Sequence, residues 1–113
     1  MKAIRQGGIS NKGEYLLHGK QAWYYEPGQI KWEFTCEAGR KTGREIFRNP
    51  DGRKVWERFH KVDGSIVWTQ YWPNGREKAQ SNWRGTKAEG KAKRWDREGN
   101  LISDVEFWNG RIL

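Results

Sequence analysis

The chain is poor in cysteine, proline and long apolar runs, and each scarcity excludes a class of protein. Cys36 is the single cysteine among 113 residues, so no internal disulfide can form, and a reducing cytoplasm is the simplest setting. No stretch approaches the roughly 18 apolar residues of a membrane-spanning helix, and no early apolar run resembles a signal peptide. We therefore expect a cytoplasmic protein with no membrane partner.

The residue patterns that catalysis and metal binding require are also missing. His18 and His60 lie far apart without a repeating partner, and Cys36 has no companion that would suggest a zinc site. No serine lies in a G-x-S-x-G motif, and no phosphate-binding G-x-x-x-x-G-K-[ST] motif occurs. The carboxylates are scattered among Lys and Arg, which predicts solvated ion pairs, and His60 beside Phe59 is interpreted as a strand-face residue. We expect no catalytic, cofactor-binding or metal-binding residues, and hence no enzyme.

Positive charge and aromatic rings are abundant instead. The 22 Lys and Arg residues outnumber the 14 Asp and Glu residues, which gives a net charge of +8. Only 35% of the residues are hydrophobic, yet eight are tryptophan. Because each large ring can bury roughly 150–250 Å², a few rings must supply most of the buried area. The charge favours an acidic or polyanionic partner, although a small polar sheet also needs charge for its solubility.

The aromatic rings recur with a period of about 24 residues. One column, spaced by 24 positions, consists of Trp23, Phe47, Tyr71 and Trp95. A second column, spaced by 24 or 25 positions, consists of Phe34, Phe59, Trp83 and Phe107. The three prolines are 23 positions apart, and each one precedes a glycine by one or two residues. This period predicts a small unit used about four times, and such repeats build surfaces rather than deep clefts.

Within each period, apolar and polar residues alternate in the manner of strands with one more buried face. Ile30, Trp32 and Phe34, for example, alternate with polar neighbours. The 14 glycines would interrupt a long helix repeatedly. We predict eight strands, joined by turns near residues 26–29, 37–43, 49–53, 62–65, 73–76, 84–90, 97–100 and 109–110. The expected fold is all-β, a single twisted antiparallel β-meander of about four hairpin repeats over residues 17–113. Residues 1–16 are expected to form an irregular lead-in or a weak first strand.

The segment from Gly39 to Gly52, GRKTGREIFRNPDG, resembles the MORN repeat in its bacterial-type variant, and residues 85–99 follow the same outline. In that family a glycine-bounded loop, an aromatic strand, an Asn-Gly-like turn and a second strand follow one another. The resemblance covers about residues 19–112, with Trp where the family usually carries Tyr or Phe and with less regular loops in the first and third units. Bacterial proteins of this YwqK-like group are often labelled antitoxins. The resemblance thus implies a MORN-like sheet that neutralises another protein, as an antitoxin, an immunity protein or a phage-borne inhibitor of host defence does.

Two features of the predicted sheet are candidates for binding. The glycine-rich turns share one edge and are basic, which suits a polyanion but also protects sheet edges from aggregation. The aromatic columns are expected to be structural, while Tyr24, Trp56, Tyr71 and Trp108 are placed on the opposite, less buried face beside arginines. The predicted partner-binding residues are Arg40, Lys41, Arg44, Trp56, Arg58, Lys61, Arg84, Lys87, Lys91, Arg94 and Trp108.

These features favour a non-enzymatic protein that binds and neutralises another protein with an acidic or nucleic-acid-binding surface. The alternative is direct binding of nucleic acid through the basic edge and the exposed rings, with a steep dependence on salt. Binding to an anionic membrane is disfavoured, because the sequence offers no amphipathic helix or lipidation motif. An open sheet edge would also allow a homodimer.

Overall fold

A computed structural model describes residues 2–9, 15–26 and 28–113, with side chains from residue 19 onward. Residues 1 and 10–14 of the predicted lead-in, the side chain of His18, and Pro27 of the first turn lie outside the described parts. The strands are β1 (Lys2–Ile9), β2 (Tyr15–Tyr24), β3 (Ile30–Glu37), β4 (Arg40–Arg48), β5 (Lys54–His60), β6 (Ser65–Tyr71), β7 (Glu77–Arg84), β8 (Lys87–Ala88), β9 (Gly90–Trp95), β10 (Leu101–Trp108) and β11 (Arg111–Ile112). The described parts hold no helix, and so none that is long and apolar enough to cross a membrane.

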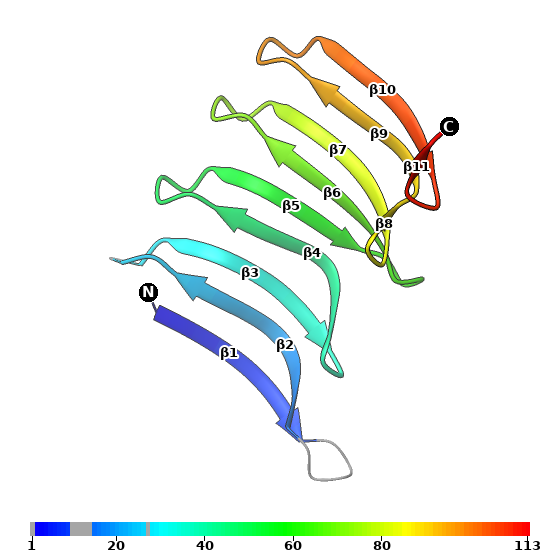
Figure 1. Cartoon of the computed structure of the whole chain (residues 1–113). Coiled ribbons are helices and arrows are strands. Elements are labelled where there is room, and N and C mark those ends of the chain that lie inside the picture. The colour runs from blue at the N-terminus through cyan, green and yellow to red at the C-terminus, as the bar shows by residue number, and fades with distance from the viewer. Residues whose placement is uncertain (1, 10–14, 27) are drawn as a thin grey trace.

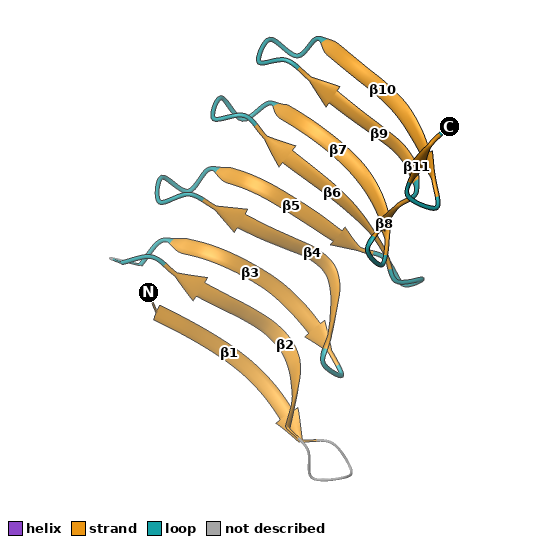
Figure 2. Ribbon diagram, in the orientation of Figure 1, coloured by secondary structure: helices purple, strands orange, loops and turns teal. Residues whose placement is uncertain are grey.

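All eleven strands belong to one antiparallel sheet whose spatial order follows the chain, with β8 paired to β7 beside the main path (Figure 1). The molecule measures 49 × 37 × 16 Å, and Figure 2 shows one curved layer of strands joined by short loops. All of the described strands lie in this one sheet (Figure 2), so none of them forms a second layer. The predicted all-β antiparallel meander is therefore confirmed. The eight predicted strands correspond to β2–β7, β9 and β10, and the structure adds β1, β8 and β11.

The turns along one edge of the sheet, here called the proline edge, show the period at which the structure repeats. Each turn is closed by a backbone hydrogen bond, from Tyr25 to Gln29, Asn49 to Arg53, Trp72 to Arg76 and Asp96 to Asn100, at 2.7–2.9 Å. The first residues of these turns are 24, 23 and 24 positions apart. The fourth position of each turn is a glycine with positive φ, for example 88° at Gly52 and 89° at Gly75, where a side chain would be strained.

The strand pairing contains a register shift beside each of these turns, and the faces that it gives to the aromatic rings differ from the predicted columns. The shifts occur at Trp23/Tyr24, Phe47/Arg48, Gln70/Tyr71 and Leu101/Ser103. Because the period is one residue short between the second and third units, Tyr71 and Trp95 are equivalent to Tyr24 and Arg48. They face away from Trp23 and Phe47, so the column predicted at a constant spacing of 24 is wrong after its second member. Phe59 likewise pairs with Arg44 and Val67 and does not share a face with Phe34.

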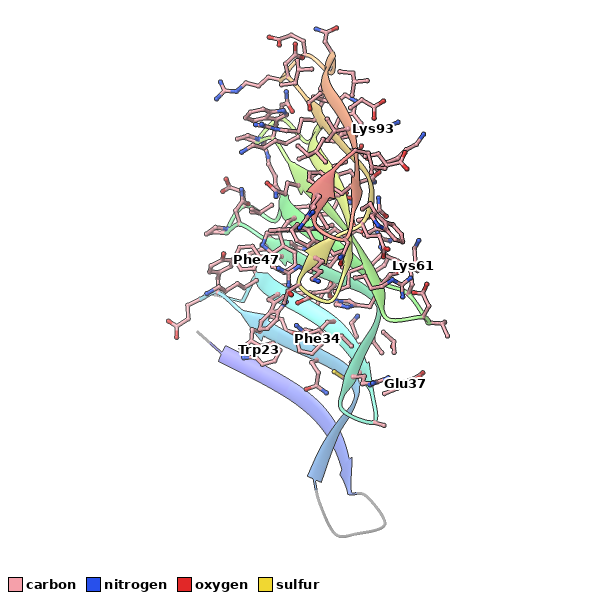
Figure 3. The ribbon with its side chains drawn as sticks, turned by 45° about the vertical axis from the view of Figure 1, so that its right-hand side comes forward. Trp23, Phe34, Glu37, Phe47, Lys61 and Lys93 are labelled. Atoms are coloured by element: carbon pink, nitrogen blue, oxygen red, sulfur yellow. The ribbon has the colours of Figure 1, made fainter. Side chains whose placement is uncertain are left out.

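The rings that do share a face define the aromatic face, and the face behind it is the opposite face. The rings of the aromatic face are Trp23, Trp32, Phe34, Phe47, Trp56, Trp68, Trp83 and Phe107. Trp23 stacks on Trp32 with ring centroids 4.8 Å apart, and Phe47 stacks on Trp56 at 5.6 Å. The row continues from Trp56 to Trp68 and from Trp68 to Trp83, both at 6.5 Å. In Figure 3, Trp23, Phe34 and Phe47 lie on one side of the sheet and Lys93 lies on the other.

Neighbouring repeats are also tied together along the proline edge. Arg53 Nη1 donates to the Pro73 carbonyl at 2.6 Å, Asn74 Nδ2 donates to the Arg97 carbonyl at 2.8 Å, and Arg76 donates to the Glu98 carbonyl. Each donor belongs to one turn and each acceptor to the next turn along the edge. These bonds fix the spacing of neighbouring hairpins at their turns, where no strand pairing joins them.

Replacing Phe47 by alanine should destabilise the sheet, because the substitution removes the stack on Trp56. A half-buried ring of this kind should contribute about 1–2 kcal/mol, which lowers the melting temperature by roughly 4 °C or more. Thermal unfolding followed by circular dichroism would measure the change. The exposed Val55→Ala is the matched control and should melt within about 2 °C of the wild type. Equal melting temperatures for Phe47→Ala and the wild type would show that the rings do not hold the sheet.

Candidate binding surface

The glycine-rich turns lie along the edge opposite the proline turns (Figure 1). Two of them are tight: Ala38 and Gly39 between β3 and β4, and Asn109 and Gly110 between β10 and β11, all have positive φ of 49–83°. The predicted turns over 37–43 and 84–90 are therefore too long. Residues 40–43 belong to β4, and residues 87–88 form β8. Because Gly43 and Gly90 adopt positive φ inside or at the start of strands, they are bulge residues and not turn residues.

Four of the predicted residues lie exposed at this glycine edge: Arg40, Lys61, Arg84 and Lys87. Arg84 already forms two ion pairs, because its guanidinium lies 2.8 Å from Glu89 and 3.6 Å from Asp63. Lys87 donates to the side-chain oxygen of Asn109 at 3.1 Å. No described carboxylate lies within ion-pair distance of Arg40 or Lys61, so these two cations are available to a ligand.

Three further predicted cations do not contribute to that edge as expected. Lys41 is half-buried, with its ammonium 2.9 Å from Glu45 and 4.9 Å from the centroid of the Trp32 ring. Arg44 lies on the opposite face, 2.6 Å from Glu57. Lys91 is exposed on the opposite face, where it pairs in register with Glu106. The basic stripe is therefore shorter than predicted.

The predicted aromatic site divides between the two faces. Trp56 was expected opposite the structural columns, but it stacks on Phe47 and belongs to the aromatic face. Trp108 lies on the opposite face and is 63% exposed. Arg58 and Arg94 lie on the aromatic face with Trp56. The error arises because the register shift next to Phe47 reverses which of the alternating residues share a face.

Arg58 forms the centre of the aromatic face. Its guanidinium carbon lies 4.6 Å from the Trp56 centroid and 4.9 Å from the Trp68 centroid, so the cation is held between two indole rings. No described carboxylate lies within ion-pair distance of Arg58, although Glu45 is its neighbour in register. A guanidinium held in this way keeps N–H donors that can form hydrogen bonds to a partner's carboxylate.

A buried carboxylate beside this stack was not predicted from the sequence. The Glu45 side chain is fully buried. Its Oε2 accepts from Trp32 Nε1 at 2.7 Å and from Lys41 Nζ at 2.9 Å, and its Oε1 lies 2.8 Å from His60 Nε2. Burial raises the pKa of Glu45, but the bonds to His60, Lys41 and Trp32 outweigh burial and leave that pKa below its ordinary value of 4.5. The prediction that the carboxylates form solvated ion pairs is therefore wrong for Glu45, whereas His60 lies on a strand face as predicted.

The partners of Glu45 come from the three strands β3, β4 and β5, so no single stretch of the sequence contains all of them. Trp32 and His60 are 13 and 15 residues away from Glu45 in the sequence. One pattern could have drawn attention to the site: Gln21 lies 24 positions before Glu45 and is also fully buried. Two polar residues at equivalent core positions indicate a buried polar interaction in that part of the sheet.

The described residues around Glu45 offer little reactive or metal-binding chemistry. Burial raises the pKa of the Cys36 thiol, which keeps this nearby group protonated at neutral pH. No group of three or more described His, Cys, Asp or Glu residues could hold a metal ion. What the bonds around Glu45 can do is fix the positions of Trp32, Lys41 and His60 next to the Arg58 stack.

The opposite face carries a different arrangement of charge. Glu33 lies 3.3 Å from Arg48 and 3.9 Å from Lys20. Glu57, which is 24 positions later, lies 2.6 Å from Arg44 and 3.2 Å from Lys54. The hydrogen bond from Arg44 is the main reason why the pKa of Glu57 lies below its ordinary value. Because this face pairs its central carboxylates with cations, the aromatic face and the Arg40–Lys61 part of the edge are the better candidates for binding.

No family model matches the chain, and no curated protein or solved structure is significantly similar to it. The resemblance to the MORN repeat therefore stays a prediction from the sequence.

Removal of the Glu45 charge should change how stability depends on pH. Since folding lowers the pKa of Glu45, its ionised form stabilises the folded chain above about pH 4.5, and this contribution is lost as the pH falls through the folded-state pKa. At pH 7 we expect Glu45→Gln to lower the free energy of unfolding by about 1–3 kcal/mol. Its deficit relative to the wild type should shrink in acid. Urea titrations at pH 7 and pH 3 measure both quantities, and a deficit that is equal at both values contradicts the assignment.

Proposed function

We propose that this chain is a protein-binding module, and that its aromatic face docks on an acidic surface of a partner protein and neutralises that partner. The Arg58 guanidinium held between Trp56 and Trp68 is the observation on which the proposal depends. Tryptophan and arginine are the residues that most often contribute the largest share of binding energy at protein interfaces.

The exposure of the aromatic face supports this proposal. Trp56, Arg58 and Trp68 are each half-buried, and no described strand forms a second layer over them. Rings that are rigid before binding lose little conformational entropy when a partner covers them. A chain with a net charge of +8 would also be steered toward an acidic partner.

Direct binding of nucleic acid is the second candidate, and the exposed cations of the glycine edge favour it. Arg40, Lys61 and Arg111 lie at that edge without a described carboxylate in ion-pair distance. Such binding would weaken steeply between low and moderate salt. We favour a protein partner because Lys41 is already bound to Glu45, which leaves Arg58 as the cation stacked on the ring row, and a run of phosphates would need several such cations beside the rings. A homodimer through an open edge strand stays a further prediction.

Substitution of Arg58 by glutamine should abolish capture of the partner without unfolding the sheet. Tagged wild type, Arg58→Gln and Lys93→Gln would be compared in pull-downs from native lysate, with circular dichroism as a check of folding. Lys93→Gln removes the same charge from the opposite face. We expect Arg58→Gln to weaken the captured interaction by about 30-fold, as for a residue that dominates an interface, and Lys93→Gln to leave it within about twofold.

Equal capture by wild type and Arg58→Gln would contradict the proposed docking face. Capture that disappears when the lysate is treated with nuclease would instead support the nucleic-acid alternative.

A further inference from the structure

Four described turns lie along the glycine edge, and two of the three gaps between them are bridged. The β5–β6 turn is joined to the β7–β8 turn by Asp63 and Arg84, which lie 3.6 Å apart. The β7–β8 turn is joined to the β10–β11 turn, because the Gly110 amide donates to the Ala88 carbonyl at 2.9 Å. These bonds hold the later turns against one another.

The first gap, between the β3–β4 turn and the β5–β6 turn, is open. Strands β4 and β5 pair only as far as Gly43 and His60, and beyond this pair no hydrogen bond or ion pair joins the two turns in the described residues. A hollow of about 1250 Å³ occupies the gap and is lined by both turns. Glu37 and Lys61, one from each turn, lie at the same edge in Figure 3.

The lining of the hollow combines available cations with open backbone. Arg40 and Lys61 approach it from the two turns, and the His60 ring lies between the hollow and Glu45. A Cβ atom built on Gly43 or Gly64 would meet nothing within 4 Å, so a ligand can approach the backbone there. The two cations suit an anionic group, since Arg and Lys side chains bind carboxylates.

The acidic and apolar residues of the hollow narrow the choice of ligand. Two carboxylates also line the hollow: Asp63, whose Oδ1 accepts from the Ser65 amide and hydroxyl at 2.8 and 2.6 Å and whose Oδ2 lies 3.6 Å from Arg84, and Glu37, which has no described cation within ion-pair distance. Phe59 is 45% exposed and Val62 is fully exposed at the rim. A ligand that contacts Arg40 and Lys61 together with Phe59 and Val62 carries carboxylates and an apolar side chain.

We propose that this hollow binds an acidic peptide segment of the partner protein, with a carboxylate between Arg40 and Lys61 and an apolar side chain against Phe59 and Val62. The inference rests on the proposed function and adds a second contact to it, because the hollow lies at the edge where the two faces meet: His60 belongs to the aromatic face and the Glu45 cluster, and Phe59 belongs to the opposite face. A peptide fits better than nucleic acid, since a base could stack on Phe59 but would find no ring at Val62, whereas an apolar side chain can contact both.

The test is a titration of the isotope-labelled chain with the peptide acetyl-EELEE-amide, followed through the amide resonances of Gly39, Gly43 and Gly64. The uncharged acetyl-QQLQQ-amide is the control ligand. We expect the acidic peptide to shift these three resonances to saturation and the control peptide to leave them in place. The double variant Arg40→Gln/Lys61→Gln should bind roughly 5- to 25-fold more weakly, as for two lost exposed ion pairs. The variant Lys91→Gln/Arg111→Gln removes the same charge elsewhere and should change the affinity by less than about twofold.

Three results would overturn the proposal: no shift of these glycines, equal weakening by both double variants, or tighter binding of oligo(dT) to the same glycines. The proposed function is judged separately by Arg58→Gln. If the peptide fails while the partner is still captured in an Arg58-dependent way, only the hollow is wrong. If the peptide binds as expected but no captured protein depends on Arg58, only the docking face is wrong.

Discussion

Cross-strand contacts between aromatic rings are the interaction on which this sheet depends. In a layered protein a sheet buries its apolar face against a second element. Here the whole molecule is 16 Å thick, and the described core contains only four buried hydrophobic residues: Ala22, Phe34, Cys36 and Ile46. The rings from Phe47 to Trp83 must therefore bury one another sideways. The same constraint leaves their outer surfaces uncovered, so the source of stability is also the surface that a partner can use.

The polar groups of the sheet follow from this constraint as well. A single-layer sheet buries few charges, yet Glu45 is fully buried because Lys41 of its own strand and Trp32 and His60 of the two neighbouring strands donate to it. Its position next to the Trp56–Arg58–Trp68 stack connects the order of the sheet to the proposed docking face. On the opposite face, Glu33 and Glu57 are each held by two cations, which keeps that face polar and stable without a covering layer.

The sequence predicts the architecture well because period and turn chemistry are local properties. The alternation of Ile30, Trp32 and Phe34 and the glycine at each turn determine the strands, and the structure confirms the meander. The faces could not be predicted, because the repeat is one residue shorter between its second and third units, which moves Tyr71 and Trp95 to the other side of the sheet, and because the register shift beside Phe47 brings Trp56 onto its face. The Glu45 cluster was missed for a related reason: its partners come from different strands, and their approach depends on the pairing of the whole sheet.

Hydrogen–deuterium exchange of the backbone amides tests most directly whether the ring row holds the sheet together. Amides that open only with global unfolding should exchange most slowly. We predict that the slowest amides lie in β4, β5 and β6, which carry Phe47, Trp56 and Trp68, and that β1 and β10 exchange much faster. Slowest exchange in β1 or β10, or uniform exchange across all strands, would contradict the account.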